Sequence, residues 1–443
     1  MLQIMKSRRK ILLVSYFFPP LGGAGSIRMT KFVKYLPGFG WEPVILTPRF
    51  PEPHHIDRSL LEEIPVGTTV IRTLSFEPTK WSGKKGFSIA VPSHLKTGIS
   101  ESLRSRIMRR IVYLIDNFCF VPDSRIGWLP FAVFRGTQVV RSEKIPVILA
   151  TGGPWTDLLI GLFIHFLTGI PLVSDFRDPW TLLLKEDPKP RLRKQAEDML
   201  EYLVFKHSRL VILNTDTARD GFVRKYHQLD PHKMIVLPNG YDEADFSCLY
   251  RVDQDKFLIT HTGSFSSFRK ASSFLKGIAK ALSFRPEIEK DLLVNFLGTV
   301  ELSDLKLIRN LGLEKSVKII PHTAHREIPG YLLRSTILLL ALPNTDMSRL
   351  CVPSKIYEYL RARVPILAII PDGCLTADII RKANAGIIVN PDNISEVAWK
   401  IVELYDSFKK RKAYYLRNED FITQFQRKAQ ARKLSSYLNN VTK

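Results

Sequence analysis

The sequence predicts an α/β protein with two doubly wound parallel sheets, each in its own domain. Strand-like apolar runs alternate with helical spacing along the chain, and the alternation restarts after a turn-rich stretch. The length of 443 residues also exceeds that of one ordinary domain. We therefore expect a first domain at 1–237, a hinge at 238–254, a second domain at 255–405 and a helical tail at 406–443 that packs back on the first domain.

The first domain opens with the pattern of a βαβ unit. A buried strand is expected at 10–16, a glycine-rich turn at 18–25, a helix at 27–35 and a second strand at 40–47. Strands joined through a helix run parallel, so this unit predicts a parallel sheet. Further strands of the same sheet are expected at 147–151, 171–175 and 210–214.

The second domain repeats the alternation without close sequence similarity to the first. It begins with a strand at 257–261 and a helix at 271–284. Doubly wound sheets bind ligands at the carboxyl ends of their strands, which makes the residues after each strand the first place to look for a site. Five more strands are expected, at 293–297, 317–320, 337–341, 365–370 and 386–389.

The charge is strongly positive, with 65 Lys and Arg against 43 Asp and Glu. Such an excess indicates nucleic acid or an anionic membrane surface as a partner. Residues 100–120 are expected to form a helix with a basic first half and an apolar second half, which suits a membrane interface. The alternative is a solvated basic helix end whose apolar half packs into the core. The lipid-facing cations of the expected helix are Arg104, Arg106, Arg109 and Arg110.

The strongest local motif is a helix start at 352–360, followed by a buried strand. Pro353 and Ser354 suit the first turn and cap of a helix, and Lys355 and Glu358 fall on one helical face. The N-terminus of such a helix favours a phosphate, and a carboxylate one turn later can accept hydrogen bonds from hydroxyls. The motif therefore predicts a nucleotide site, with an ordinary capped helix carrying an ion pair as the alternative.

Two glycine turns could bind phosphate as well. Gly22 and Gly23 lie between a strand and a helix, and Arg28 follows one turn into that helix. The alternative for this turn is a tight turn without a ligand. The second turn and the cations after it comprise Gly263, Ser264, Arg269 and Lys270. The alternative for these two cations is an ordinary basic pair on the surface.

The segment 175–180 directly follows a predicted strand. Asp175, Arg177, Asp178 and Trp180 are candidate functional residues, with Asp175 as a possible catalytic carboxylate, because α/β sheets place their chemistry at the carboxyl ends of strands. The alternative is an Arg–Asp pair that holds a loop.

Other chemistry is not indicated by the spacing of the reactive residues. The ten histidines show no metal-binding spacing, and those at 54, 55, 322 and 325 are interpreted as loop residues. The four cysteines form no metal or redox pair, which favours a reduced, cytoplasmic compartment.

These motifs occur together in an order that resembles the nucleotide-sugar glycosyltransferases of family four. The resemblance extends over nearly the whole chain, and the Asp-Phe-Arg-Asp-Pro-Trp segment at 175–180 looks like the variant of bacterial members that build polysaccharides. It implies the GT-B fold, in which two Rossmann-like domains face a cleft. It also implies transfer with retention from a nucleotide-sugar, a UDP- or GDP-sugar, without metal or cofactor.

The resemblance assigns roles to single residues. Glu358 matches the glutamate that holds the donor ribose, and Lys270, preceded by Arg269, matches the lysine on the diphosphate. Gly22 and Gly23 match the turn that faces the phosphates, and Asp175 falls where many relatives have a histidine at the sugar. The residues expected on the acceptor or sugar side are Arg28, Arg177, Asp178 and Trp180. Two positions depart from the family pattern: Leu350 replaces a glutamate and Ser264 replaces an arginine.

The expected protein is thus a hexosyltransferase that acts in cell-surface glycan synthesis on a lipid-linked or polysaccharide acceptor. It would be cytoplasmic and peripheral on the inner face of the plasma membrane, held by anionic lipid. The alternatives are a nucleotide-sugar 2-epimerase or degenerate homologue, and a nucleic-acid-binding protein. The sequence shows no nucleic-acid-binding motif with interleaved aromatic residues, so nucleic acid is not expected as a partner.

Overall fold

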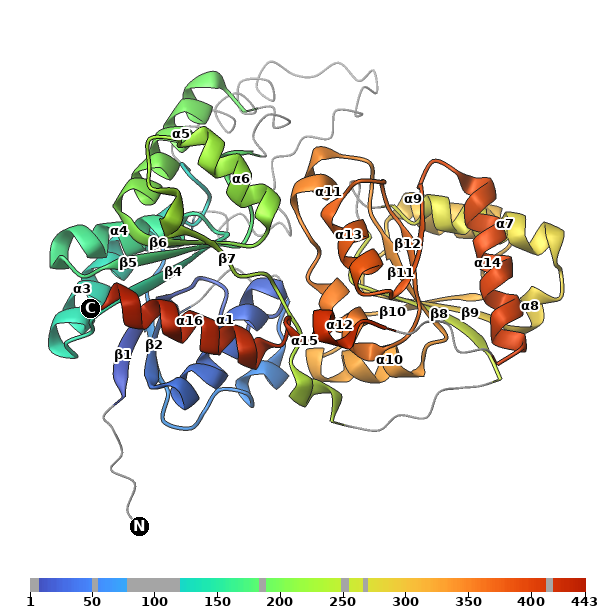
Figure 1. The fold of residues 1–443 in the computed structure, drawn as a ribbon, viewed down its shortest axis with the longest axis horizontal. Helices are drawn as coiled ribbons and strands as arrows, with labels where there is room; N and C mark the ends of the chain where they lie inside the picture. The colour runs from blue at the N-terminus through green and yellow to red at the C-terminus, as the bar shows by residue number, and fades with distance from the viewer. Residues whose placement is uncertain are drawn as a thin grey trace, which may run out of the picture. The chain divides into compact units, whose positions relative to one another are not determined.

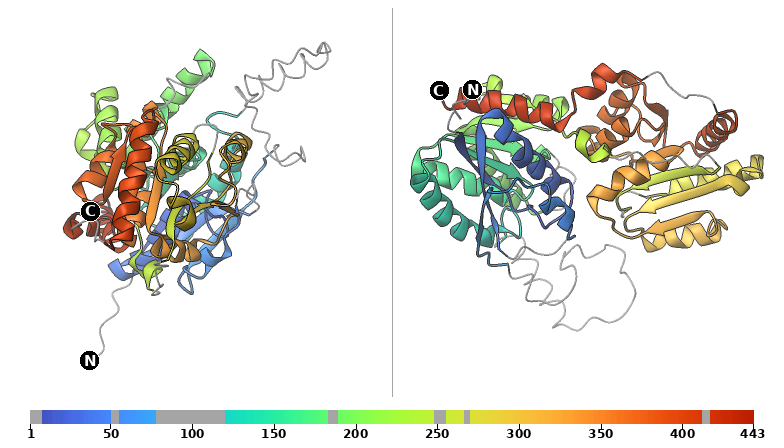
Figure 2. Two further views of the ribbon diagram at one scale, coloured as in Figure 1. Left: turned by 90° about the vertical axis from the view of Figure 1, so that its right-hand side faces the viewer. Right: turned by 90° about the horizontal axis from the view of Figure 1, so that it is seen from below.

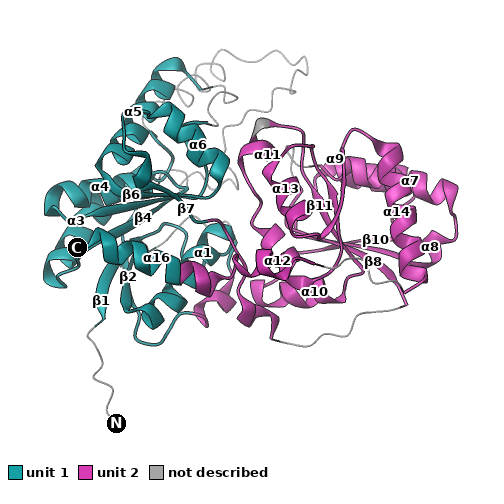
Figure 3. Cartoon of the chain, viewed as in Figure 1, with its two compact units in different colours: residues 1–56, 64–237, 432–443 teal, residues 57–63, 238–431 magenta. Residues whose placement is uncertain are grey.

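The computed structural model describes residues 8–49, 55–77, 120–182, 189–247, 255–265, 270–411 and 417–443. The chain divides into two compact units (Figure 3). Unit 1 comprises residues 1–56, 64–237 and 432–443, and unit 2 comprises residues 57–63 and 238–431. Each unit contains one sheet of parallel strands, as the alternating sequence pattern predicted.

The sheet of unit 1 has seven strands in the order β3-β2-β1-β4-β5-β6-β7. The order changes direction between β1 and β4, whose strands pair in register from Leu12 opposite Ile148. This is the topological switch point, where ligands bind in doubly wound sheets. The sequence analysis missed the edge strand β3. The strands are β1 (Arg9–Val14), β2 (Trp41–Pro48), β3 (Thr69–Thr73), β4 (Ile148–Gly152), β5 (Leu172–Phe176), β6 (Ser208–Leu213) and β7 (Met234–Val236).

Helices cover both faces of this sheet (Figures 1 and 2). On one face, α3 to α6 pack on side chains such as Leu12, Ala150 and Leu213 in a single apolar cluster. On the other face, α1 continues into η1, and the Arg432 guanidinium of α16 lies over the Phe39 ring of η1, 5.4 Å from its centroid. The helices are α1 (Ala24–Tyr35), η1 (Leu36–Phe39), η5 (Ile126–Trp128), α3 (Leu129–Ser142), α4 (Thr156–Thr168), α5 (Arg191–His207), α6 (Asp216–Lys225), η7 (Pro231–Lys233) and α16 (Arg427–Val441).

The sheet of unit 2 has six strands in the order β10-β9-β8-β11-β12-β13. Its switch point lies between β8 and β11, where Ile337 pairs with Ile259. All five neighbouring pairs are parallel. The strands are β8 (Phe257–Thr262), β9 (Leu292–Leu297), β10 (Val317–Ile320), β11 (Ile337–Ala341), β12 (Ile366–Ile369) and β13 (Gly386–Val389).

Two apolar clusters fill the two faces of this second sheet. One holds α7, α9 and α14, and the other holds α10, α12 and α13 (Figure 1). The helices are η2 (Arg58–Leu61), η8 (Glu243–Phe246), α7 (Ser272–Phe284), α8 (Ile288–Asp291), α9 (Leu302–Asn310), η9 (His325–Glu327), α10 (Ile328–Arg334), α11 (Asp346–Leu350), α12 (Lys355–Ala362), α13 (Leu375–Lys382), α14 (Ile394–Lys409) and α15 (Glu419–Thr423).

The division into units differs from the expected domains at three places. The expected hinge, 238–254, groups with unit 2. Residues 57–63, expected in the first domain, group with unit 2, and the expected tail is split, with 406–431 in unit 2 and 432–443 in unit 1. The reason is that α16 packs its last turns on β1 and β2: Trp41 Nε1 donates to Asn439 Oδ1 at 3.2 Å.

Some predictions fall where the structure gives no description. Residues 248–254 of the expected hinge, 100–119 of the expected basic helix, and Arg269 lie outside the described residues. The same is true of the four cations expected at the membrane, Arg104, Arg106, Arg109 and Arg110. Within the described ranges, no helix is both long and apolar enough to cross a bilayer.

Candidate functional site

The helix start predicted as a nucleotide site is present in unit 2. Helix α12 begins at Lys355, and Ser354 precedes it with helical dihedral angles (φ −57°, ψ −32°) and makes no side-chain capping hydrogen bond within the described chain. The expected side-chain cap is therefore wrong. The turn is closed by the backbone instead, because Ile356 N–H donates to the Pro353 carbonyl at 3.1 Å.

Lys355 and Glu358 turn to different partners. The Lys355 ammonium donates to the carbonyl of Thr262, at the carboxyl end of β8, and Glu358 Oε1 lies 2.9 Å from His325 Nε2. The alternative of an intrahelical ion pair thus does not describe this helix. Instead, Lys355 contacts the end of β8, and Glu358, one helical turn later, contacts His325.

His261 helps to hold that cation. Its ring is fully buried and stacks on Phe265 with centroids 4.2 Å apart. Nδ1 lies 2.9 Å from the Leu339 carbonyl, which can only accept, so Nδ1 carries the hydrogen and Nε2 the lone pair. That lone pair faces Lys355 Nζ at 3.2 Å. The sequence analysis gave His261 no role, although a histidine at the end of an apolar strand was a usable signal.

The Gly263 turn passes directly over the Lys355 ammonium. Gly263 has φ +97°, and a Cβ at this position would lie 2.8 Å from Lys355 Nζ. Gly298 packs against it, with φ +132°, and a Cβ there would lie only 2.9 Å from the Gly263 carbonyl carbon. Ser264 is tied down as well, because its Oγ accepts from Thr299 N–H at 3.3 Å. The turn therefore has a fixed shape above a fixed positive charge.

Tyr359 fastens the same helix to the same strand. Its buried hydroxyl accepts from Thr262 N–H at 2.9 Å, and burial raises the pKa of Tyr359 to about 12. The phenol therefore stays protonated at neutral pH. Lys355 and Tyr359, one helical turn apart, both bind Thr262, so α12 and the end of β8 form one unit.

Glu358 is oriented by His325, which the sequence analysis interpreted as a loop residue. The His325 side chain is 10% exposed, and its second ring nitrogen lies 4.0 Å from Asp245 Oδ2. Its backbone N–H donates to Asp57 Oδ2 at 2.7 Å. Burial would raise the pKa of Asp57, but the hydrogen bonds from Ser59 and the His325 backbone outweigh it and lower the pKa. Glu358 itself keeps 20% of its side chain exposed, so it can still accept from a ligand.

Lys270 occupies the predicted place at the start of α7. It is exposed and lies just before Ala271, whose N–H donates to Asp304 Oδ2 at 3.1 Å. Burial raises the pKa of Asp304, and the Ala271 N–H and the Lys270 charge partly offset this. Leu350, at the position of a family glutamate, is the last residue of α11.

One group of carboxylates in unit 2 has the spacing of cation ligands. Glu63, Asp242 and Asp245 bring one oxygen each to within 4.8 Å of one another. Asp242 is buried and the other two are half-buried, and clusters of acidic groups also occur without an ion, so this cluster by itself does not define a metal centre.

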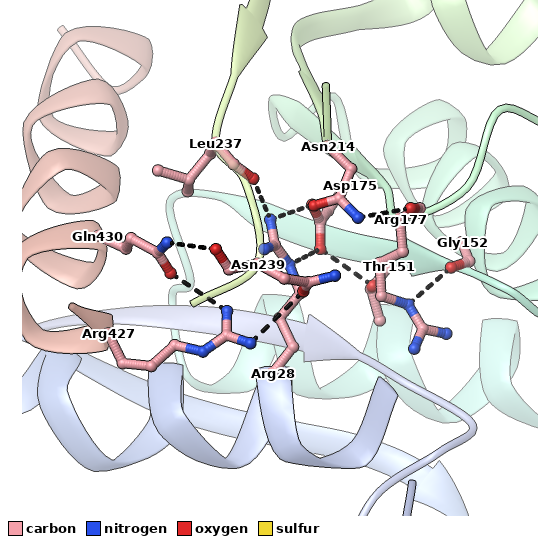
Figure 4. Close-up of polar contacts among 10 residues, drawn as sticks. All are labelled: Arg28, Thr151, Gly152, Asp175, Arg177, Asn214, Leu237, Asn239, Arg427 and Gln430. Atoms are coloured by element: carbon pink, nitrogen blue, oxygen red, sulfur yellow. Dashed lines mark hydrogen bonds and ion pairs between the residues drawn. The ribbon is translucent and has the colours of Figure 1, made fainter. Parts of the chain in front are cut away.

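In unit 1, Asp175 is engaged with Arg28 (Figure 4). Arg28 Nε and Nη2 donate to the two carboxylate oxygens at 3.0 and 2.8 Å, and Thr151 Oγ1 donates at 3.1 Å. Both charged side chains are 1% exposed. Burial at this level does not fit the predicted contact of Asp175 with a sugar. The carboxylate holds Arg28, whose Nη2 also donates to the Leu237 carbonyl at 3.0 Å.

Arg177 connects the segment 175–180 to the first glycine turn. Its Nε donates to the Gly152 carbonyl at 2.8 Å (Figure 4). A Cβ at Gly25 would lie 1.6 Å from Arg177 Nη1. The guanidinium therefore covers the first turn of α1. That turn is preceded by Gly23 at φ +96° and by Gly22, whose N–H donates to the His55 carbonyl at 2.8 Å.

Asp178 and Trp180 differ in burial. Asp178 is exposed, as a ligand-facing residue must be. Trp180 is 2% exposed, stacks on Trp155 at 5.1 Å, and donates from Nε1 to Glu197 at 3.2 Å. Its expected contact with an acceptor does not fit this burial, and its ring belongs to the core of unit 1.

The sequence analysis missed one buried acid at the switch point of unit 1. Asp157 is fully buried, its Oδ2 accepts from Tyr16 N–H at 2.8 Å, and its Oδ1 has no hydrogen-bond partner among the described residues. Burial raises the pKa of Asp157 well above its ordinary value. Asp157 lies in the first turn of α4, directly before an apolar run, where a carboxylate is equally expected on an exposed helix end, so the sequence did not mark it as buried.

The family of the chain follows from residues 23–240, which match the model of the Glycosyl transferase 4-like domain. The chain therefore contains a glycosyltransferase domain of this kind over about half of its length, and the protein is a glycosyltransferase. A comparison with curated protein sequences gives no match.

Solved structures extend the likeness over the whole chain. Sucrose-phosphate synthase from Thermosynechococcus elongatus is similar with a TM-score of 0.66 at 13% identity, over 98% of this chain and 99% of that chain. HepE from Anabaena, solved with UDP and glucose, gives 0.63 at 14% identity, over 98% and 100%. UDP-GlcNAc 2-epimerase from Methanocaldococcus jannaschii gives 0.54 at 13%, over 98% and 99%. At these identities the comparisons show the fold, which is the predicted GT-B fold of two Rossmann-like domains.

Proposed function

We propose that this glycosyltransferase moves a hexosyl group from a UDP- or GDP-sugar to a lipid-linked or polysaccharide acceptor, with retention at the anomeric carbon. The observation that carries the proposal is that Lys355 and Glu358, one turn apart on α12, point to different partners, the Thr262 carbonyl and His325. A diphosphate would meet the Lys355 charge and the Gly263 turn, and a ribose would meet Glu358 one helical turn away.

The chemistry follows from the charge that develops when the sugar–phosphate bond breaks. Negative charge grows on the leaving diphosphate, where Lys355, Lys270 and Arg269 would stabilise it. Lys355 would supply the positive charge that Ser264, in the place of a family arginine, does not. Attack by the acceptor hydroxyl on the same face, with its proton passing to the leaving phosphate, needs no protein nucleophile.

The relatives support a nucleotide-sugar donor. HepE, similar in fold, has been solved with UDP-glucose. The epimerases of the same fold bring an alternative, but the family of residues 23–240 favours transfer. We further propose cell-surface glycan synthesis on the inner face of the plasma membrane, with Arg104, Arg106, Arg109 and Arg110 on anionic lipid and with Arg177 and Asp178 on the acceptor side.

The first test is a thermal-shift screen of the whole protein with UDP, GDP, ADP, CMP, NAD and a short RNA. A nucleotide at about 100 times its Kd stabilises by about 2.7 kcal/mol, so a bound nucleotide is readily seen. We expect a shift with UDP or GDP. Stabilisation by RNA alone would refute the donor site.

The variants Lys355→Met and Glu358→Gln test the carrying observation. Loss of a charge-assisted hydrogen bond costs about 1.5–3 kcal/mol, so each variant should weaken binding of the selected nucleotide by about 10- to 150-fold. Glu314→Gln, an exposed glutamate of unit 2 paired with Arg309, is the matched control. Equal binding by all four proteins would remove the assignment. Product analysis with a UDP-sugar then separates transfer from epimerisation.

A further inference from the structure

Unit 1 exposes a set of large apolar side chains on two neighbouring helices, here named the aromatic face. On α3, Phe131 and Phe134 are 39% and 68% exposed, and on α4, Phe163, Phe166 and Leu167 are 44%, 51% and 53% exposed. The spacing within each helix, three or four residues, puts these side chains on the outward side of each helix.

The two helices bring these residues onto one surface. A Cβ at Gly136 of α3 would lie 2.4 Å from Ile164 Cδ1 of α4, so the helices touch closely at their middle. At their ends, Arg141 Nη2 donates to the Leu167 carbonyl at 2.9 Å. Figure 1 shows α3 and α4 side by side at the same side of the sheet. The exposed aromatic residues therefore lie on two adjoining helices that cover the same face of the sheet of unit 1.

The aromatic face exposes an apolar area comparable to the largest apolar patch on a typical monomer, about 300–600 Å². With about 200 Å² for a whole phenylalanine side chain, the four rings expose about 400 Å². Patches of this size on soluble proteins commonly mark interaction sites. Phenylalanine is also among the residues that insert at the boundary of headgroups and acyl chains.

The charged side chains of these two helices favour an anionic partner. Along 129–142 and 156–168 the exposed charged side chains are Arg135 and Arg141, and the carboxylate in these helices, Asp157, is fully buried. A second copy of the same face would bring like charges together. An anionic surface would pair with both cations.

We propose that the aromatic face, flanked by Arg135 and Arg141, docks unit 1 on an anionic lipid bilayer, with the phenylalanine rings inserted at the interface. The inference rests on the lipid-linked acceptor of the proposed function. It uses residues distinct from the expected basic helix, and it places α3 and α4 against the membrane.

The test is sedimentation of the full-length protein with vesicles of phosphatidylcholine alone and with phosphatidylglycerol added. Phe134→Ser/Phe166→Ser removes two exposed rings, and Leu302→Ser/Trp399→Ser, at positions 76% and 59% exposed in unit 2, is the matched control. Melting temperature and nucleotide binding of each variant verify the fold and the donor site separately.

We expect the wild type and the control to bind the anionic vesicles and the double phenylalanine variant to bind at least about tenfold more weakly. Arg135→Gln should reduce the dependence on phosphatidylglycerol. Equal binding by both double variants, or no binding of the wild type to vesicles, would overturn the inference. So would a wild-type dimer that the phenylalanine variant converts to a monomer without loss of vesicle binding. Nucleotide binding that persists in these cases would leave the donor site standing.

Discussion

Replacing Asp175 by asparagine tests whether this residue acts on substrate or holds the fold of unit 1. Its carboxylate accepts three side-chain hydrogen bonds, two from Arg28 and one from Thr151, and both charged groups are 1% exposed. Asparagine turns an NH₂ group toward the Arg28 donors and leaves a buried guanidinium without its counter-charge. Removing one partner of a buried pair costs about 3–5 kcal/mol.

Tryptophan fluorescence during urea or thermal unfolding is the assay. Five of the six tryptophans fall within the residue ranges of unit 1, so the signal reports mainly on that unit. The expected loss lowers the melting temperature by roughly 6–20 °C. Asp198→Asn is the control, since Asp198 is 50% exposed, pairs with Lys225 and should cost no more than about 1 kcal/mol. The double variant Arg28→Met/Asp175→Leu should regain much of the stability.

The positioning role is refuted if Asp175→Asn is as stable as Asp198→Asn. A large fall in transfer rate with unchanged stability would show instead that Asp175 acts on the sugar, as the sequence resemblance implies. A fall in stability with residual transfer by the properly folded fraction supports the positioning role.

Two further predictions concern the buried acid and the glycine turn. Because burial raises the folded-state pKa of Asp157, the stability that this group contributes is greatest below its unfolded pKa of about 3.9 and is lost as pH rises. Asp157→Asn should therefore gain stability relative to wild type between pH 4.5 and pH 7.5, measured as melting temperature; an unchanged difference would contradict the raised pKa. Gly263→Ala combines φ +97° with a Cβ 2.8 Å from Lys355 Nζ, and should weaken nucleotide binding at least tenfold. Gly169→Ala, at φ +72° with open space around it, should cost about 1 kcal/mol of stability and leave binding unchanged. Equal nucleotide affinities would show that the turn does not touch the donor.

Much of the fold could be predicted because short apolar runs and helical spacing in the sequence indicate its strands and helices. The apolar runs at 10–16 and 257–261 are buried strands whose neighbours lie parallel, and the restart of the alternation near 238 coincides with the change of unit. Edge strand β3 was missed because its residues are half-exposed and carry no strong period.

The site was predictable only as far as residue types and spacing go. Lys355 and Glu358 could be chosen because they follow a helix start at the right interval. Their separation onto Thr262 and His325 depends on strands and turns far along the chain. The same limit explains Ser354, whose backbone is already helical, so that its hydroxyl does not cap α12.

The sequence by itself determined the alternation of strands and helices, the two sheets and the placement of phosphate-binding residue types after strands, because these depend on neighbours within a few turns. The tertiary structure alone decided which polar groups are buried and with whom. Asp175 is buried against Arg28 and Trp180 against Trp155, while His261, His325 and Asp157 have partners that the sequence did not indicate. The physical reason is that burial and the partner of a charge are set by contacts between segments distant in sequence, which no local pattern records.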